Sequence, residues 1–156
     1  MLKLTKKADY GLIALRHLAV SARGTASAKE IADAYSIPLP LLAKVLQKLT
    51  KSNLTLSVAG TNGGYRLARN PRTISALEVI RTIDGPIILT NCFTEHGECD
   101  QSDRCTVRAP LRHVHEAILG LLERMTVQDL ASPRNDEPNL PPPASSSQWQ
   151  SVLHVL

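Results

Sequence analysis

Aromatic side chains are scarce in this chain, which has one tryptophan, one phenylalanine and three tyrosines among 156 residues. Because 43% of the residues are nevertheless hydrophobic, the core has to be built from leucine, isoleucine, valine and alanine, which favours helices with a small sheet. Long apolar runs are also missing. No stretch approaches the roughly 20 residues that span a bilayer, so we expect no contact with a membrane.

Signals of secretion and of catalysis are missing as well. The first residues contain neither an apolar signal core nor a small-residue cleavage site, so we expect a cytoplasmic protein. There, clustered cysteines more often bind metal or carry out redox chemistry than form disulfide frameworks. The chain has no glycine-rich loop, nucleophile motif or second domain, which argues against an enzyme. A catalytic thiol paired with His96, His113 or His115 is the weakest interpretation.

Charge is unevenly distributed along the chain. Residues 1–83 carry 13 lysines and arginines against 4 acidic residues, a formal charge of +9, whereas residues 84–156 carry 5 against 10, or −5. A basic half joined to an acidic half suggests a polyanionic partner for the first half only. A solvated charged face is the simpler alternative.

Local signals predict three helices near the N-terminus. Thr5 is a suitable N-cap for a helix over about 6–22, and Ser27 with Glu30 forms a capping box for a short helix ending near Tyr35. Pro40 suits the first turn of a third helix that reaches about residue 52. Its apolar residues recur at helical spacing, which predicts one buried face.

A hairpin and a fourth helix are expected next. Residues 54–58 and 65–68 read as strands joined by a turn that contains Asn62-Gly63, a pair typical of hairpins. Ser75 and Glu78 form a second capping-box pattern for a helix that reaches about Asp84, where Gly85-Pro86 breaks it. The order of elements predicts a mainly α fold with a small β-hairpin, a winged helix-turn-helix, over residues 1–84.

The rest of the chain divides into three predicted parts. Residues 85–107 form a cysteine-rich loop, residues 108–131 a long dimerisation helix, and residues 132–156 a disordered tail rich in proline and serine. One stripe of the long helix is apolar, which suggests homodimerisation or, alternatively, packing on its own domain: Leu111, Val114, Ile118, Leu121, Leu122 and Met125.

The predicted partner of the basic half is double-stranded DNA carrying an operator. The second helix of a helix-turn-helix enters the major groove with its N-terminal residues near base edges, while helix N-termini and wings contact phosphates. The candidate DNA-binding residues are Thr5 and Lys6 in the first helix, Pro40, Leu41, Lys44 and Lys48 in the third, and Gly60, Asn62, Gly63, Gly64, Tyr65 and Arg66 in the wing.

The chain contains only three cysteines, Cys92, Cys99 and Cys105, all in one short stretch. Neither of their spacings matches structural zinc sites, in which two to four residues usually separate the paired cysteines. Longer gaps between soft thiolate ligands suit an iron–sulfur cluster, [2Fe-2S] or [4Fe-4S], although its fourth ligand must come from elsewhere. Zinc, a thiol–disulfide switch and inert buried cysteines remain alternatives.

Residues 1–131 resemble the iron–sulfur-sensing winged-helix regulators of bacteria, of the IscR, NsrR and SufR type. The resemblance rests on Leu4-Thr5-Lys6 with Asp9-Tyr10, on the Gly60–Leu67 wing, on Ile74–Ile80 and on the cysteines. The spacing of the first two cysteines is most similar to regulators of the SUF cluster-assembly operon. The resemblance implies a DNA-binding transcription regulator, expected to be a repressor, that forms a homodimer.

The resemblance also implies a ligand set. Cys92, Cys99 and Cys105 would be cluster ligands, and Asp9 of the partner chain matches an acidic ligand found in some members. In other members a histidine three residues past the last cysteine completes the site, but this chain has Arg108 there. Many members also carry an arginine at the position of Ala59, so the corresponding minor-groove contact is in doubt.

Overall fold

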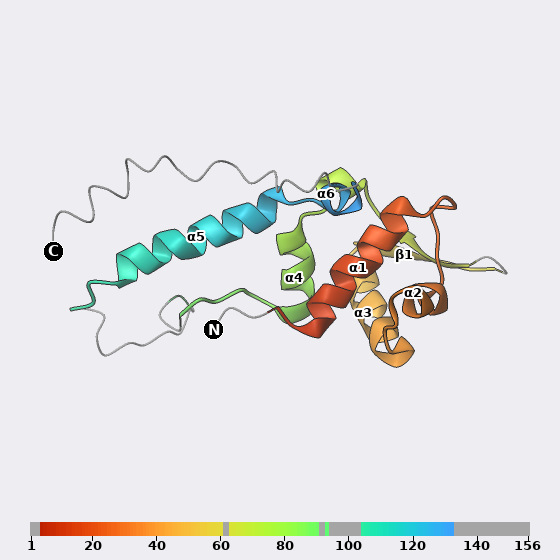
Figure 1. Ribbon diagram of the computed structural model, residues 1–156, viewed down its shortest axis with the longest axis horizontal. Helices are drawn as coiled ribbons and strands as arrows, with labels where there is room; N and C mark the ends of the chain where they lie inside the picture. Colours follow the sequence, from red (N-terminus) through yellow and green to blue (C-terminus); the bar gives the residue numbers. More distant parts are fainter. Residues whose placement is uncertain (1–3, 61–62, 91–92, 94–103, 133–156) are drawn as a thin grey trace.

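The computed structural model describes residues 4–60, 63–90, 93 and 104–132. The described part is mostly helical with one two-stranded antiparallel sheet, which confirms the predicted winged-helix fold (Figure 1). Its elements are α1 (Lys6–Val20), α2 (Ala28–Tyr35), α3 (Leu39–Lys51), β1 (Thr55–Val58), β2 (Gly64–Leu67), the short 3-10 helix η1 (Pro71–Thr73), α4 (Ala76–Asp84), α5 (Arg108–Arg124) and α6 (Val127–Ala131). The tail predicted over 132–156 lies outside the described residues, apart from Ser132.

Polar caps fix where the first helices begin. The Thr5 hydroxyl accepts a hydrogen bond from the Ala8 amide at the start of α1. Both halves of the predicted capping box are formed between Ser27 and Glu30. These contacts satisfy amides that a helix leaves unpaired in its first turn. The Ser75 hydroxyl likewise accepts from the Glu78 amide.

The Glu78 carboxylate is used differently from the sequence expectation. Its Oε1 accepts from Arg69 Nη2 at 2.5 Å, and the bond back to the Ser75 amide that would complete a capping box is not formed in this described helix. Arg69 follows the hairpin, so this ion pair joins the base of the wing to the first turn of α4. Both side chains are exposed, so the ion pair adds little stability and mainly fixes the orientation of the wing base relative to α4.

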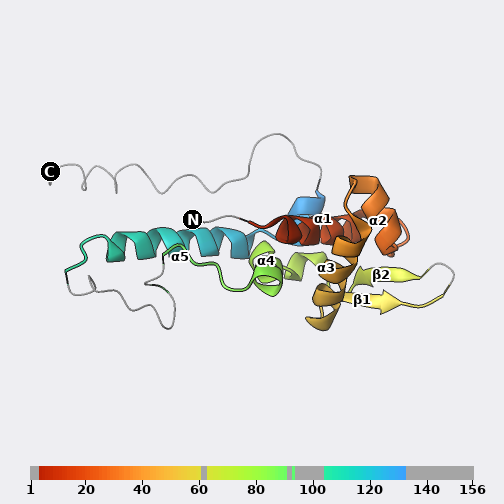
Figure 2. The same cartoon turned by 90° about the horizontal axis from the view of Figure 1, so that it is seen from below.

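The hairpin forms the wing and projects away from the helices (Figure 2). Its strands pair in the register Thr55 to Leu67 through Val58 to Gly64. The amide and carbonyl of Tyr65 also bond the carbonyl and amide of Ala26, at 2.8 and 3.0 Å, which ties the wing to the segment before α2. The wing is therefore fixed at its base.

Two clusters of buried side chains hold the DNA-binding domain together, both built on faces of α1 and α3. One cluster joins α1 and α3 to α4 and α6, and it contains Leu15, Leu49, Ile74, Ile80 and Val127, all at most 2% exposed. The other joins α1 and α3 to α2 through Leu18, Ile31, Leu42 and Leu46. Aliphatic residues build the core, as the composition predicted.

The segment expected as one long helix over 108–131 contains two helices. α5 ends at Arg124, and Thr126 caps α6 through a second complete capping box with Asp129. α6 returns to the DNA-binding domain, where the Val127 amide bonds the Ile74 carbonyl at 2.9 Å and the Arg16 Nε bonds the Leu130 carbonyl at 2.9 Å. Residues far from the N-terminus thus complete the core of the N-terminal domain.

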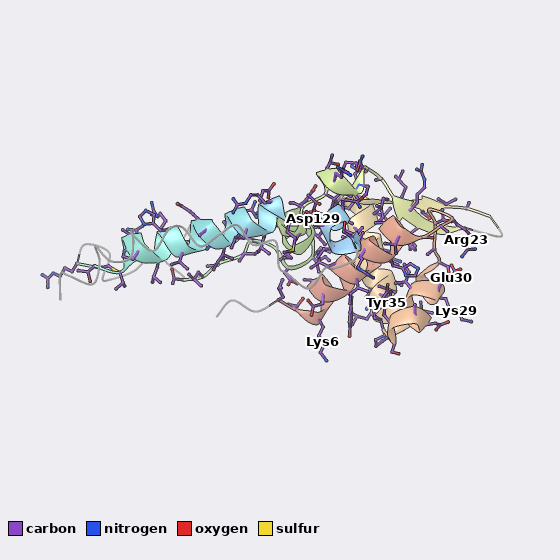
Figure 3. All side chains as sticks on the ribbon, turned by 45° about the horizontal axis from the view of Figure 1, so that its top comes forward. Lys6, Arg23, Lys29, Glu30, Tyr35 and Asp129 are labelled. Carbon is purple, nitrogen blue, oxygen red and sulfur yellow. The ribbon has the colours of Figure 1, made fainter. Side chains whose placement is uncertain are left out.

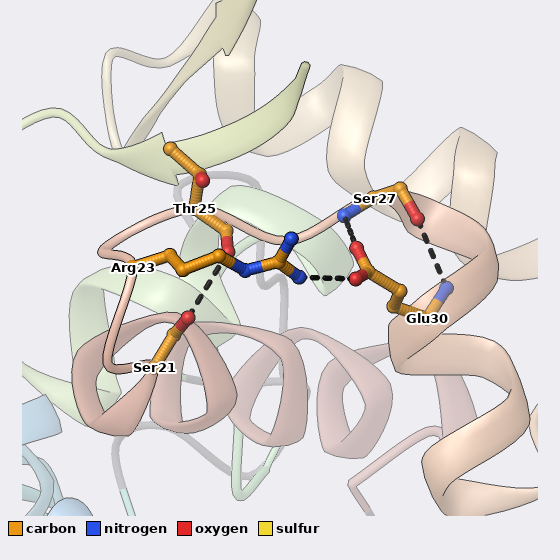
Figure 4. Close-up of polar contacts among 5 residues, drawn as sticks. All are labelled: Ser21, Arg23, Thr25, Ser27 and Glu30. Carbon is orange, nitrogen blue, oxygen red and sulfur yellow. Dashed lines mark hydrogen bonds and ion pairs between the residues drawn. The ribbon is translucent and has the colours of Figure 1, made fainter. Parts of the chain in front are cut away.

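The capping box of α2 should give the stability of the fold a defined pH dependence (Figure 4). The Ser27 amide donates to Glu30 at 2.6 Å, and Arg23 also pairs with this carboxylate. Together these bonds lower the pKa of Glu30 from 4.5 to about 2. A lowered folded-state pKa means that the stabilisation is complete above pH 4.5 and is lost as the pH falls toward 2.

We therefore expect the Glu30→Gln variant to be less stable than the parent at neutral pH, and the difference to shrink as the pH falls from 4.5 toward 2. Urea unfolding at several pH values measures it. Asp33→Asn is the matched control, because Asp33 is exposed on the same helix and has no side-chain bond to a described residue. A pH-independent difference for Glu30→Gln would contradict the assignment.

Candidate nucleic-acid interface and sensor segment

The predicted recognition helix α3 has one buried and one solvent-facing side. Leu42, Val45, Leu46 and Leu49 are buried. Pro40, Lys44 and Lys48 are exposed, and Leu41 is half-buried. Pro38 and Pro40 at the start of α3 leave its N-terminus without a side-chain cap. The amides of Leu41 and Leu42 already bond the Pro38 carbonyl, so the exposed cations are the feature of α3 that suits an anionic surface.

The two lysines of α3 differ in their surroundings. Lys48 Nζ donates to the Ile83 carbonyl at the end of α4, at 2.9 Å. Lys44 has no side-chain hydrogen bond or ion pair with any residue in the described part of the chain. Lys44 is thus the freer cation for DNA, whereas Lys48 already has a partner within the protein.

The start of α1 presents two further predicted DNA contacts. Lys6 is exposed, and its side chain extends outward from the first turn (Figure 3). Thr5 is exposed but already bonded, because its hydroxyl donates to Asp84 Oδ1 at 2.7 Å. Asp9 is exposed on the same turn, and its carboxylate has no partner among the described residues. Asp9 is therefore free to bind a group supplied by another chain.

Structural constraints explain the wing glycines. A Cβ on Gly64, whose φ is +151°, would lie 2.4 Å from the Ala26 carbonyl oxygen, and one on Gly63 would lie 2.4 Å from the Val58 carbonyl oxygen. Tyr65 is half-buried and packs against the core. Arg66 is exposed in β2 and Gly60 is exposed at the turn, whereas Asn62 lies outside the described residues. Arg66 is the wing side chain best suited to reach phosphate.

Of the three cysteines, only Cys105 is described, as a half-buried free thiol; Cys92 and Cys99 lie outside the described residues. The segment that follows α4 runs beneath α5 (Figure 2). Phe93, next to Cys92 in the chain, stacks on His115 of α5 with ring centroids 5.3 Å apart. One described residue of the cysteine segment thus packs on the N-terminal half of α5, and the segment leads directly into that helix.

A buried donor lies near the last cysteine. Arg108 Nε is buried and has no hydrogen-bond partner in the described part of the chain. A buried unpaired N–H is costly and calls for a partner. Three cysteines with an arginine three residues past the last of them have the chemistry that an anionic, thiolate-ligated metal group requires, although Cys92 and Cys99 lie outside the described residues. No group of three or more potential metal ligands is assembled within the described residues themselves.

α5 extends from the DNA-binding domain (Figure 1), and half of its predicted apolar stripe is left exposed, because Leu111 and Ile118 are half-buried and Leu122 packs against the core. None of its residues is buried by the described part of this chain. Val114, Leu121 and Met125 remain 42%, 38% and 45% exposed. Among the described residues, no helix combines the length and apolarity needed to cross a membrane.

Sequence reasoning missed Asp84 and the Ile83 carbonyl as partners of Thr5 and Lys48. No local signal reveals these contacts, because Asp84 lies 79 residues from Thr5 and Ile83 lies 35 residues from Lys48. Sequence reasoning also missed α6. A signal was available in this case, since Thr126 and Asp129 have the spacing of a capping box.

Comparisons with known proteins agree on one family. Residues 4–133 match the Rrf2 family model, described as an iron-dependent transcriptional regulator. The HTH-type transcriptional regulator NsrR of Shouchella clausii is 34% identical over 137 residues, covering 86% of this chain and 92% of that protein. IscR of Klebsiella pneumoniae is 30% identical over 132 residues, covering 84% and 80%.

A solved structure points to the same fold. CymR, the global cysteine regulator of B. subtilis, superposes with a TM-score of 0.73 at 30% identity and covers 84% of this chain and 97% of its own. These relatives are named as regulators of transcription or of cysteine, not as enzymes.

Proposed function

Because this chain belongs to the Rrf2 family of helix-turn-helix transcription regulators, we propose that it is a repressor whose affinity for its operator is set by an iron–sulfur cluster held in the cysteine segment. The observation that carries the proposal is the placement of that segment. The segment lies in the chain between the DNA-binding domain and α5. Phe93 of this segment packs against α5, and the Nε atom of Arg108 in α5 has no partner among the described residues.

DNA binding is assigned to the exposed cations of α1, α3 and the wing. Lys44 would reach base edges or phosphates in the major groove, with Pro40 and Leu41 beside it. Lys6 and Arg66 would contact phosphates on either side. Their exposure and lack of described partners support this assignment.

The residues that would hold the cluster are Cys92, Cys99 and Cys105, with Asp9 of a partner chain as the fourth ligand. A cluster of this kind supplies a group that oxygen or nitric oxide attacks and that is lost when iron or sulfide is scarce. Arg108 would donate its unpaired N–H to the thiolate side of the site. The Asp9 carboxylate lies in the first turn of α1 and has no partner in the described part of the chain, which supports the proposed role of this residue.

A second copy of this chain is the proposed partner of the apolar stripe on α5. In the resulting dimer the two recognition helices would face successive major grooves, about 34 Å apart, on a near-palindromic operator. The proposed targets are genes of cluster assembly, as in the SUF operon regulators that the cysteine spacing resembles.

The proposal is tested by purifying the protein without oxygen and measuring visible absorption, iron and acid-labile sulfide. We expect a coloured protein with matched iron and sulfide, and loss of both in a variant with all three cysteines changed to alanine. Asp9→Ala should retain cluster poorly but bind DNA normally when apo. A colourless protein that cannot be reconstituted would exclude the cluster.

A second candidate is a regulator switched by thiol–disulfide chemistry or by zinc. It is favoured by the similarity to CymR, a cysteine regulator, and by the half-buried free thiol of Cys105. Thiol titration and zinc analysis of the colourless protein distinguish the two. Operator affinity that changes with thiol oxidation in metal-free protein would support this candidate.

A further inference from the structure

Two consecutive residues at the end of α4 contact both helices that carry proposed DNA contacts. Asp84 Oδ1 accepts from the Thr5 hydroxyl at 2.7 Å, and Asp84 Oδ2 accepts from the Thr5 amide at 3.3 Å. The carbonyl of the preceding residue, Ile83, accepts from Lys48 Nζ of α3 at 2.9 Å. One turn of α4 therefore holds the start of α1 and the second half of the recognition helix.

Close packing supports this junction. The Ile83 side chain is 7% exposed and fills the space over Gly11 of α1, where a Cβ would lie 2.2 Å from Ile83 Cδ1. The hydrogen bonds to Thr5 and the packing contact at Gly11 both lie in the N-terminal half of α1. Because protein interiors are densely packed, a shift of the α4 end would displace α1 rather than be absorbed locally.

The chain leaves this junction directly toward the cysteine segment. α4 ends at Asp84, and its C-cap is Gly85, whose φ is +86° and whose amide bonds the Arg81 carbonyl. Eight residues later Phe93 packs on His115 of α5. The covalent path from the DNA-binding domain into the proposed sensor thus begins at Asp84.

We propose that Asp84 is a positioning residue for operator binding. Its carboxylate orients the N-terminal turn of α1 for phosphate contact, and Lys48 orients α3 by bonding the neighbouring carbonyl rather than by contacting DNA. The junction passes the state of the cysteine segment to both helices. This inference rests on the proposed function in DNA binding, and its experiments separate the two.

The first experiment is a double-mutant cycle with Thr5→Val and Asp84→Asn, measured as operator affinity of cluster-free protein. Both substitutions weaken or remove the bond between the Thr5 hydroxyl and Asp84, and Thr5→Val also removes the N-cap bond to the Ala8 amide. We therefore expect Asp84→Asn to lower affinity by roughly 2- to 10-fold, the range of one or two net hydrogen bonds, Thr5→Val to lower it at least as much, and the double variant to lose little more than Thr5→Val. Thr5→Ser retains the hydroxyl and should restore parental affinity. Unchanged affinity in Asp84→Asn, or additive losses, would overturn the proposal.

The second experiment compares Lys48→Ala with Lys44→Ala on the same operator. If Lys44 contacts a phosphate, its removal should reduce the salt slope of binding by about one unit. Lys48→Ala should lower affinity with the slope unchanged, because its ammonium bonds a protein carbonyl. A slope reduced equally in both variants would show that Lys48 contacts DNA and would overturn its part in the junction.

The third experiment substitutes alanine for all three cysteines in the parent and in Asp84→Asn. We expect the cysteine substitutions to change operator affinity in the parent and to have a smaller effect in Asp84→Asn. Equal effects in both backgrounds would overturn the transmission role. No effect in the parent would instead reject the proposed sensor and, with it, the transmission role, while the double-mutant cycle would still decide the positioning role of Asp84.

Discussion

Replacing Val127 with alanine should lower the free energy of unfolding of the DNA-binding domain by about 2–3 kcal/mol, from lost apolar burial and the cavity that remains. Val127 is 0% exposed and belongs to the core cluster that holds α1, α3 and α4 together. It lies more than 40 residues beyond α4, so the effect would establish that the domain is completed by a distant segment.

Urea unfolding followed by circular dichroism measures this effect. Val20→Ala is the matched control, because it deletes the same two methyl groups from a side chain that is 50% exposed, where changes usually stay within about 0.5 kcal/mol. Ending the chain after Met125 should be more damaging, since it also removes the Val127 bond to Ile74 and the carbonyl that Arg16 contacts. Equal losses in Val127→Ala and Val20→Ala would show that α6 does not contribute to the core.

Local signals were sufficient for the winged helix itself. Thr5 and Ser27 mark the starts of α1 and α2 because a cap acts within three residues, and the apolar spacing of α3 identifies its buried face because a helix repeats every 3.6 residues. Predicted ends of these elements differ from the observed ones by at most two residues, since helix ends depend on weak terminal contacts. α1, for example, ends at Val20 and not near residue 22.

Contacts between distant segments could not be predicted in this way. Periodicity correctly placed Lys48 on the exposed side of α3, but its partner is a backbone carbonyl of α4, and no residue type signals a carbonyl. The sequence pattern of the fourth helix predicted where α4 ends, but it did not predict the hydrogen bond between Asp84 and Thr5. For the cysteines, spacing limited the chemistry to a few candidates, whereas the geometry of Cys92 and Cys99 lies outside the described residues.

Introducing aspartate at both Val114 and Leu121 should convert the protein to a monomer and lower its affinity for a palindromic operator by about 100-fold or more. Both side chains belong to the exposed part of the apolar stripe of α5, and the proposed dimer would bury them. Burying a carboxylate without a partner costs more free energy than the packing of two helices against each other supplies. In a dimer the second DNA-binding domain has a high effective concentration at its half-site, which raises operator affinity by about 10²–10⁴-fold. Loss of the dimer removes this gain in affinity.

Sedimentation equilibrium and operator titration measure the two effects separately. A half-site DNA supplies the decisive comparison, because a folded monomer should bind a half-site as the parent does while losing the palindrome. His113→Asp is the control for charge on this helix, since it adds one of the two carboxylates at an exposed position of α5 away from the apolar stripe. A double variant that remains dimeric would show that another surface joins the subunits, and equal loss on half-site and palindrome would indicate damage to the DNA-binding domain instead.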